Sequence, residues 1–208
     1  MGIYEKPSQR FLDSIESNFN FKPPREHGYD VVDSIKAMHE GKGKFFLAMG
    51  GNFLSATPDT LFTAEALRKC KMTVHVSTKL NRSHLVHGEE AIILPCLARS
   101  DKDIVNGEEQ IVSCENSMGV VQQSKGNLKP VSKNLLSESV IVCRLAMAVL
   151  ANRSKIDWDK YASNYDHVRD AIEKTIPGFE NYNTRVREPG GFYLPNCNRE
   201  GSFNTEIG

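Results

Sequence analysis

The chain lacks an excess of charge of either sign. Its 208 residues contain 26 Lys and Arg and 26 Asp and Glu, so the formal net charge is +0. A protein without a net field does not draw nucleic acid or an anionic membrane toward itself, so we expect no nucleic-acid partner. Long hydrophobic runs are also missing. The longest, residues 140–150, contains Arg144 and is shorter than the roughly 20 residues that cross a bilayer, so we expect no membrane association.

Cysteine is scarce and scattered. None of the five cysteines forms a C-x-x-C motif, and no histidine cluster has the spacing of metal ligands. An odd number of separated cysteines favours reduced thiols, and the N-terminus shows no basic-then-apolar secretory signal. We expect a cytoplasmic protein in which this segment binds neither a metal ion nor an iron–sulfur cluster. The cysteines are Cys70, Cys96, Cys114, Cys143 and Cys197.

The stretch 44–59, KFFLAMGGNFLSATPD, is the most informative feature that is present. It predicts a buried strand that stops at Gly50-Gly51-Asn52, then a short loop and a helix from Pro58 or Asp59. Glycines let a ligand approach the backbone, and the N–H groups of a helix start favour an anion. Ligands of open α/β sheets bind at the carboxyl ends of the strands. The pattern is therefore typical of a nucleotide pocket.

This stretch also has a second interpretation. It lacks the complete dinucleotide fingerprint G-x-G-x-x-G, and it lacks the lysine of a phosphate-binding P-loop. An ordinary strand-to-helix turn without a ligand accounts for the same spacing equally well.

Hydrophobic periodicity predicts strands that alternate with helices in the first half of the chain. We expect strands at 44–49, 72–77 and 91–94, helices at 8–18, 30–40 and 59–69, and a helical turn at 82–87. Such alternation implies parallel pairing. The predicted fold class is therefore α/β, Rossmann-like and three-layered, with a short and mostly parallel sheet.

The second half is predicted to be helical and irregular. We expect an extra strand at 109–114, a long irregular loop at 116–129, and helices at 135–151, 157–162 and 164–175. Ser132 or Asn134 is the expected start signal of the first of these helices. Residues 177–208 show little periodicity. The chain is therefore divided into a partial Rossmann-like lobe at 1–130 and a helical extension at 131–208.

The predicted sheet is small for an independent domain. Three parallel strands are fewer than a doubly wound domain usually has, and the sequence stops within a predicted loop. We therefore expect an interior piece of a longer chain. Such a piece should expose apolar surface where the remainder of its parent chain packs, so self-association is also expected.

Several separated motifs carry a family resemblance. They are AMGGN, SATPD, VHVSTKLNRSHLVHGEEAIILPCLARSDKD, ENSMG and LKPVSKNLLSE, in this order along the chain. Together they resemble the large molybdopterin oxidoreductases, and most closely the formate-dehydrogenase-alpha-like branch of the dimethyl sulfoxide reductase superfamily. The resemblance extends over nearly the whole chain.

The resemblance implies a redox role. Proteins of this family are much longer and hold molybdenum or tungsten between two molybdopterin guanine dinucleotides, and most also carry an iron–sulfur cluster. The matching region would be part of a Rossmann-like lobe that binds one dinucleotide. On this view the piece lacks the residue that ligates the metal and has no activity by itself. Formate is the substrate that the resemblance implies.

We expect the dinucleotide to lie over the ends of the first two parallel strands. Gly50 and Gly51 would admit its ribose and phosphates, while Asn52 can bond a ribose hydroxyl or only cap the turn. Ser77 and Thr78 would offer hydroxyl groups to the guanosine. The family often places an acidic residue near this point to read guanine, and this chain departs from that pattern.

Five further residues complete the predicted cofactor site. Lys79 either meets phosphate charge or faces solvent. Asn81 and Ser83 occupy the family's loop after the second strand, and Pro95 ends the third strand. Asp59 either replaces the missing acidic residue or serves as a simple helix N-cap.

No catalytic constellation is visible in the sequence. His84 and His87 have no carboxylate or nucleophile at a telling spacing, and we interpret Cys96 as structural. The favoured hypothesis is a cofactor-binding portion of a molybdopterin oxidoreductase, with no catalytic residue and no metal ligand of its own. The alternatives are a small α/β enzyme that acts on a nucleotide and a non-catalytic nucleotide-binding or interaction module.

Overall fold

The computed structural model describes residues 7–197 and 199–202, which form two compact units. Unit 1 contains Pro24–Ala98 and Pro130–Ile141. Unit 2 contains Pro7–Pro23, Arg99–Lys129 and the described residues from Val142 onward. This division differs from the predicted boundary near residue 130, because residues 99–129 pair with segments from the C-terminal part of the chain.

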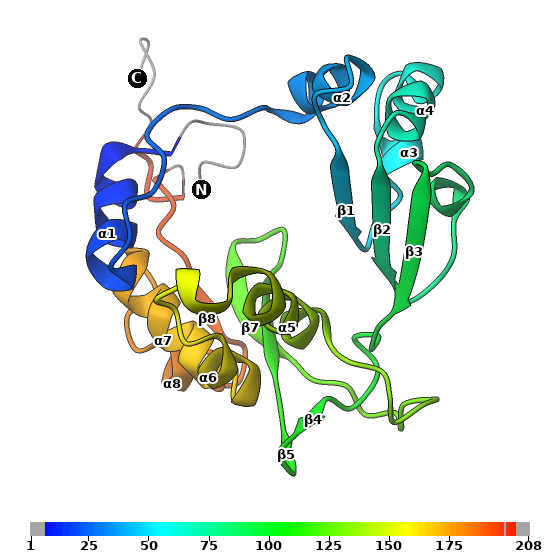
Figure 1. The fold of residues 1–208 in the computed structure, drawn as a ribbon. Helices are drawn as coiled ribbons and strands as arrows, with labels where there is room; N and C mark the ends of the chain where they lie inside the picture. The colour runs from blue at the N-terminus through cyan, green and yellow to red at the C-terminus, as the bar shows by residue number, and fades with distance from the viewer. Residues whose placement is uncertain (1–6, 198, 203–208) are drawn as a thin grey trace. The chain divides into compact units, whose positions relative to one another are not determined.

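Unit 1 is built on a parallel sheet of three strands in the order β1-β2-β3 (Figure 1). The strands are β1 (Phe45–Met49), β2 (Met72–Ser77) and β3 (Glu90–Pro95). The connecting helical elements are α2 (Val31–His39), α3 (Phe53–Ala56), α4 (Thr60–Arg68) and the 3-10 turn η1 (Arg82–Leu85). The predicted α/β class with a short parallel sheet is confirmed.

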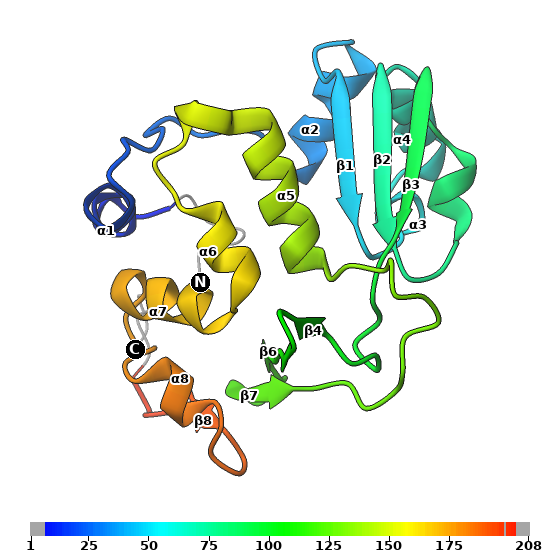
Figure 2. The same cartoon turned by 60° about the horizontal axis from the view of Figure 1, so that its bottom comes forward.

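Helices cover one face of this sheet. Figure 2 shows α3 and α4 together on one side of the three strands. Helix α2 packs against α4, and Phe46 of β1 packs against the apolar core between them. This core contains Ile35, Met38, Leu54, Ala64, Ala66, Leu67, Cys70 and Val86. Because side chains alternate along a strand, Ala48, Thr73 and His75 share the face of Phe46.

Unit 2 combines short antiparallel strands with helices. Strand β4 (Ile104–Val105) pairs with β5 (Glu108–Glu109), and β7 (Val120–Ser124) lies between β6 (Val112–Glu115) and β8 (Phe192–Tyr193). The helical elements are α1 (Gln9–Phe19), η2 (Ala151–Arg153), α6 (Trp158–Ser163), α7 (Asp166–Thr175) and α8 (Tyr182–Arg185). Helix α5 (Glu138–Leu150) begins in unit 1 and ends in unit 2.

A buried arginine organises unit 2. Arg169 of α7 is 3% exposed. Its Nε donates to Asn183 Oδ1 at 2.7 Å and its Nη1 donates to the backbone oxygen of Ile111 at 2.9 Å, while Nη2 bonds Asp166. One side chain therefore joins α7, α8 and the segment before β6. The apolar core beside it contains Ile111, Val121, Phe179, Tyr182, Val186 and Phe192.

Three local predictions for the second half were wrong. The loop expected at 116–129 contains β7, which forms because Val121 is buried in the core and pairs with Phe192. Residues 177–208, expected to be irregular, contain α8 and β8. Helix α5 begins after Ser137, whose Oγ accepts from the Val140 N–H at 3.2 Å, and not at Ser132 or Asn134.

Candidate functional site

The turn after β1 exposes backbone at the carboxyl edge of the parallel sheet. Gly50 and Gly51 have φ values of +63° and +67°, a region that strongly favours glycine. The Gly50 N–H donates to the backbone oxygen of Val76 at 2.8 Å, so the turn is attached to β2. A Cβ added to Gly51 would meet nothing within 4 Å. The turn is therefore held from one side and open on the other.

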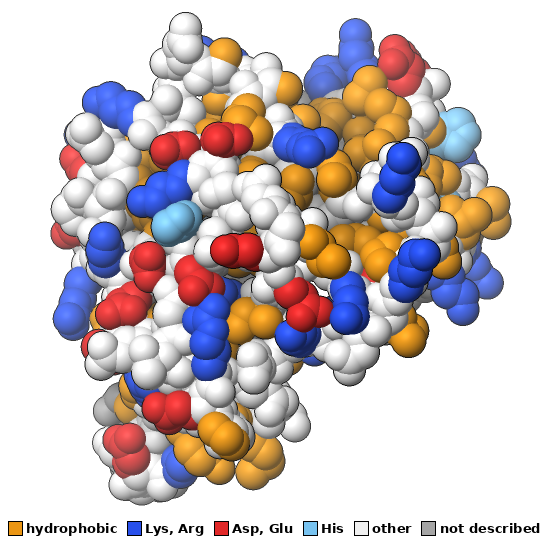
Figure 3. All heavy atoms as spheres, turned by 90° about the horizontal axis from the view of Figure 1, so that it is seen from below, with side chains coloured by type: hydrophobic (Ala, Val, Ile, Leu, Met, Phe, Trp, Pro, Cys, Tyr) orange, Lys and Arg blue, Asp and Glu red, His pale blue; other side chains and the backbone are white. Residues whose placement is uncertain are grey.

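Figure 3 views the molecule from the end toward which the parallel strands run. Over unit 1 it shows hydrophobic side chains interspersed with Lys and Arg. Thr78 and Lys79, predicted to contact the cofactor, are both exposed just beyond β2. A basic side chain at an exposed strand end is suited to an anionic ligand.

Three predicted cofactor residues form hydrogen bonds with the loops at this edge. Ser83 Oγ donates to Asn52 Oδ1 at 2.8 Å and accepts from the Leu54 N–H at 3.0 Å. Asn81 Nδ2 donates to the backbone oxygen of Gly51 at 2.7 Å. These bonds join the loop after β1 to the loop after β2. Asn52, Asn81 and Ser83 thus lie together, and here they hold the glycine turn in place.

His84 determines the hydrogen-bonding role of Ser77. The Asn81 backbone N–H donates to His84 Nδ1 at 3.0 Å, so Nδ1 accepts in this contact. The backbone oxygen and Oδ1 of Asn81 each lie 3.2 Å from the same nitrogen. In the neutral ring the proton is then on Nε2, which donates to Ser77 Oγ at 3.0 Å. The Ser77 hydroxyl keeps its own proton for another acceptor. In this tautomer Nε2 of the neutral His84 ring donates to the Ser77 hydroxyl and does not accept from it.

His75 is a buried imidazole next to this network. It is 4% exposed, and its Nε2 has no hydrogen-bond partner among the described residues. Its ring lies against that of His84, with centroids 4.7 Å apart. Burial, and then the neighbouring His84, lower the pKa of His75 below its ordinary value. His75 is therefore uncharged at neutral pH, which its position in the core requires.

Glu138 is a residue of this edge that sequence analysis missed. Cys96 follows β3 and forms a bridge with Leu136, and the Leu97 N–H donates to the backbone oxygen of Leu136 at 2.9 Å. This pairing brings the start of α5 to the carboxyl edge. Glu138 Oε1 lies 3.6 Å from the place where a Cβ on Gly50 would be. The available signal was the end of the LKPVSKNLLSE motif, where Ser-Glu precedes an apolar helix.

Cys96 is buried beneath the same edge. Burial, and then the negative charge of Glu138, raise the pKa of its thiol. The sulfur is therefore protonated at neutral pH and is not a reactive thiolate. All five cysteines are free, and the pKa values of Cys70 and Cys143 are also raised by burial.

The two remaining predicted site residues are at the border of the edge. Pro95 ends β3 and pairs in register with Ser77, so it lies beside the central strand end. Asp59 caps α4, since its Oδ1 accepts from the Phe62 N–H at 2.9 Å. The N-cap interpretation explains Asp59 in this structure without any ligand.

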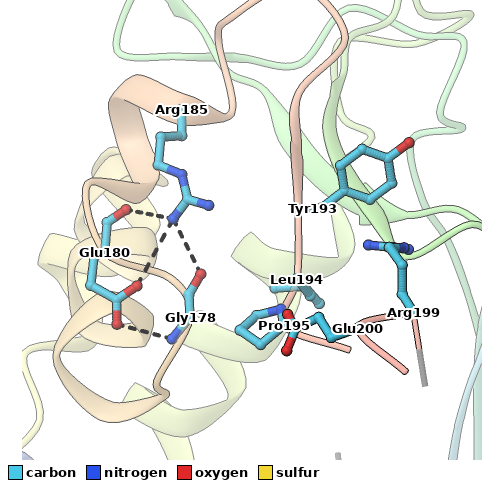
Figure 4. A pocket seen from close by; sticks show the side chains of 8 residues that line it. All are labelled: Gly178, Glu180, Arg185, Tyr193, Leu194, Pro195, Arg199 and Glu200. Atoms are coloured by element: carbon cyan, nitrogen blue, oxygen red, sulfur yellow. Dashed lines mark hydrogen bonds and ion pairs between the residues drawn. The ribbon is translucent and has the colours of Figure 1, made fainter. Parts of the chain in front are cut away.

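A separate hollow of about 390 Å³ lies in unit 2 (Figure 4). Arg185 lies over the ring of Phe192 at 3.9 Å, and its Nη1 donates to the backbone oxygens of Glu180 at 2.9 Å and Gly178 at 3.2 Å. Arg199 likewise lies over the ring of Tyr193 at 4.1 Å. The lining also contains the carboxylates of Glu180 and Glu200. Opposite charges and engaged guanidinium groups give this hollow a structural explanation.

The chain matches part of several longer bacterial proteins. No family profile matches the chain. Uncharacterized oxidoreductases of Mycobacterium bovis and Mycobacterium tuberculosis H37Rv are each 49% identical over 209 residues, covering 100% of this chain and 27% of the relative. Protein YdeP of Escherichia coli K12 is 39% identical over 208 residues with the same coverage. This chain is similar to one part of larger oxidoreductases. It spans just over a quarter of the length of the curated relatives that it matches.

The edge of the sheet offers hydrogen-bonding groups around an open glycine turn. Among residues 7–197 and 199–202, no three His, Cys, Asp or Glu side chains are grouped so that they could hold a metal ion. Within the same described ranges, none of the helices has the length and apolar character needed to cross a membrane. The chemistry offered by the edge is that of hydrogen-bond donors, one carboxylate and an open glycine turn.

Proposed function

We propose that this chain is the cofactor-binding portion of a longer oxidoreductase and that its sheet edge binds one half of a molybdopterin guanine dinucleotide. The observation that carries the proposal is the open Gly50-Gly51 turn at the carboxyl edge of a parallel sheet, next to the Ser77 hydroxyl. The relatives named oxidoreductases support the redox part of the proposal. The separated motifs described above support the type of cofactor.

The residues at the edge fit the dinucleotide part of this group. Among the described residues, no acceptor pairs with the backbone N–H of Gly51 or Asn52, and such groups suit phosphate oxygens. Lys79 adds an exposed positive charge. Ser77 has a hydroxyl proton to donate. Glu138 accepts from N–H and O–H donors and repels phosphate, so it suits the guanosine and supplies a carboxylate that the segment after β2 lacks.

This chain would position the cofactor without performing the chemistry. The metal and pterin supply the two-electron transfer when bound, while the protein supplies binding and orientation. The Asn52–Ser83 and Asn81–Gly51 hydrogen bonds would keep the glycine turn open before the dinucleotide arrives. The 208-residue chain alone should therefore show no redox activity. Formate is the substrate that we propose for the complete protein.

The first experiment identifies the ligand. The complete protein is purified from its full reading frame and denatured, and the extract is analysed by mass spectrometry for a guanine-containing pterin and by elemental analysis for molybdenum and tungsten. Recovery of the pterin with either metal supports the proposal. A protein that retains a plain nucleotide and no pterin would instead be a nucleotide-binding module, and a protein without any guanine compound would refute the proposal.

The second experiment tests the site. Glu138→Gln keeps the shape of the side chain and removes its charge, so guanosine binding should weaken about tenfold, as expected for a lost charge-assisted hydrogen bond. Glu65→Gln is the matched control, because the Glu65 side chain is 62% exposed on α4. Occupancy is measured as guanosine monophosphate released per protein. Equal occupancy in both variants would remove Glu138 from the site.

A further inference from the structure

One face of the parallel sheet is apolar and largely exposed at its two outer strands. Phe45, Leu47 and Met49 of β1 and Ile92 and Leu94 of β3 are between 37% and 55% exposed. In register, Leu47 lies beside Val74 and Val74 beside Ile92, while Met49, Val76 and Leu94 form the next row. Because residues two apart share a face of a strand, these side chains point to the same side. We call these five outer residues the open face.

The opposite face differs at strand β1. There Phe46 packs against the core beneath α2 and α4 and Ala48 is buried, whereas β3 is exposed on both faces and β2 is buried on both, through Thr73 and His75 on one side and Val74 and Val76 on the other. Parallel sheets are almost always covered on both faces, since their crossover helices lie on each side. The open face of unit 1 departs from this rule. Its side chains carry no charge, so the surface that covers it should also be apolar.

The side of the sheet formed by the outer strand β3 is also uncovered. Every residue of β3 is exposed, and β3 is the outermost strand of its sheet. Exposed edges are usually protected by lysine, by inward-pointing charge or by a bulge. Here the interior of the strand reads Ala91-Ile92-Ile93-Leu94, and only Glu90 and Pro95 at its ends are protective. An unprotected apolar edge is stable in solution only when another segment covers it.

We propose that the open face and the β3 edge are an intramolecular interface, covered in the complete protein by an apolar helix and a strand from the rest of the same polypeptide. The relatives are long enough to contain such a helix and strand. The matched part is 27% of each relative, so nearly three-quarters of their length lies outside it. A segment of the same chain is present at a high effective concentration that a second copy does not reach. The inference requires the longer polypeptide and does not require the cofactor.

The experiment introduces single cysteines into the complete protein. Leu47→Cys and Ile92→Cys probe the open face, and Leu61→Cys is the matched control because Leu61 is 79% exposed on α4. Each variant reacts with a maleimide under native conditions, and labelling is followed peptide by peptide by mass spectrometry. Labelling at positions 47 and 92 should be about tenfold slower than at position 61, since a covered thiol reacts only after local opening.

Two native thiols serve as internal references. Cys70 is completely buried in the core of unit 1, so it stays unlabelled only while that unit is folded. Cys197 is exposed and reports that the reagent is active. If Cys70 becomes labelled in a variant, unit 1 of that variant is not folded. Met49→Cys or Leu94→Cys is then used in place of that variant, because both residues belong to the open face.

The same variants in the 208-residue chain complete the test. With Cys70 still protected, positions 47 and 92 should label there as fast as position 61. Fast labelling of these positions in the complete protein would overturn the proposal, and so would protection in a 208-residue chain that light scattering shows to be monomeric. Protection that disappears on dilution, together with a dimer mass by light scattering, would assign the face to a second copy and also overturn it. Protection in a complete protein that lacks the pterin would support this inference while refuting the proposed function.

Discussion

The two units are stabilised by different kinds of interior. Unit 1 has an apolar core between helices and a parallel sheet, and the hydrogen bonds of Asn52, Asn81 and Ser83 join two loops at one edge of that sheet. Unit 2 surrounds a buried guanidinium, and Arg169 bonds groups from three separate segments. The loop hydrogen bonds of unit 1 therefore organise a surface, whereas the hydrogen bonds of Arg169 in unit 2 organise a core. Substitutions in the two units should separate these roles.

The largest effect is expected for Arg169→Met in unit 2. The change leaves the Ile111 oxygen and Asp166 without their buried donor, and breaking a buried pair in this way costs about 3–5 kcal/mol. Arg187→Met is the control, since Arg187 bonds the same carboxylate with a side chain that is 44% exposed, and it should cost less than about 1 kcal/mol. Hydrogen exchange of the α7 amides measures both. Similar losses in the two variants would show that unit 2 does not depend on its buried arginine.

Alanine substitution at two glycines with the same backbone conformation can separate the cost of backbone strain from the cost of steric crowding. Gly191 in unit 2 has φ +69°, and an added Cβ would lie 2.0 Å from the Val121 oxygen, whereas Gly51 in unit 1 has φ +67° and open space. Gly51→Ala should cost about 1–2 kcal/mol from the left-handed conformation alone. Gly191→Ala should cost about 1–3 kcal/mol more, because its methyl group forces the backbone apart. Local exchange of β7 and β1 amides gives each value, and equal costs would contradict the close approach at Gly191.

Ser83→Ala tests the loop network of unit 1. The variant leaves the buried Leu54 N–H without its acceptor and Asn52 Oδ1 without its donor, at an expected cost of about 1–3 kcal/mol. Ser55→Ala on α3 is the control, since Ser55 is exposed, and it should stay within about 0.5 kcal/mol of the parent. The slowest-exchanging amides of unit 1 measure the difference. A neutral Ser83→Ala would mean that the two loops hold their positions without this hydroxyl.

Acidification should weaken the two units at different pH values. Burial and His84 lower the pKa of His75 in unit 1 from its ordinary 6.5. The unfolded chain then takes up a proton before the folded one, so unit 1 has its full stability above about pH 6.5 and loses it as the pH falls toward the lowered value.

Asp166 makes unit 2 lose stability at a lower pH than unit 1. Its burial raises the pKa, but the hydrogen bonds from Arg187 and then Arg169 lower it overall from 3.8. Its contribution is complete above that value and is lost only as the pH falls through the lowered pKa. Unit 1 should therefore lose protection from hydrogen exchange between pH 7 and 5 while unit 2 keeps it. His75→Phe should remove the early response and Asp166→Asn the late one; coincident loss in the parent would contradict both assignments.

The sequence predicted unit 1 more fully than unit 2. Strands 44–49, 72–77 and 91–94 and the helix at 59–69 are confirmed to within one residue, because each is a single hydrophobic run ended by glycine, polar or proline signals. Strand β7 escaped prediction because its residues are ordered by Phe192, which lies far along the chain. Local periodicity contains no trace of such a partner.

In the candidate site, too, features set by local sequence were predicted and features set by long-range pairing were not. The glycine turn was predicted from its sequence pattern and the site role of Ser77 from the family resemblance, and the structure places both at one edge. The bonds of Asn52, Asn81 and Ser83 to one another depend on how two loops meet. Glu138 reaches the edge only because Leu136 pairs with Cys96, 40 positions earlier in the sequence. Such long-range pairing has no local signature.

The amino-acid sequence by itself determined the α/β character of unit 1, the positions of its strands and the turn where its backbone is open. These are consequences of short-range chemistry: side-chain alternation, glycine conformation and helix capping. Only the tertiary structure decided the tautomer of His84, the burial of Arg169, the presence of Glu138 at the edge and the exposure of the open face. Each of these depends on which distant segments meet, because burial and hydrogen-bond partners are properties of the assembled chain.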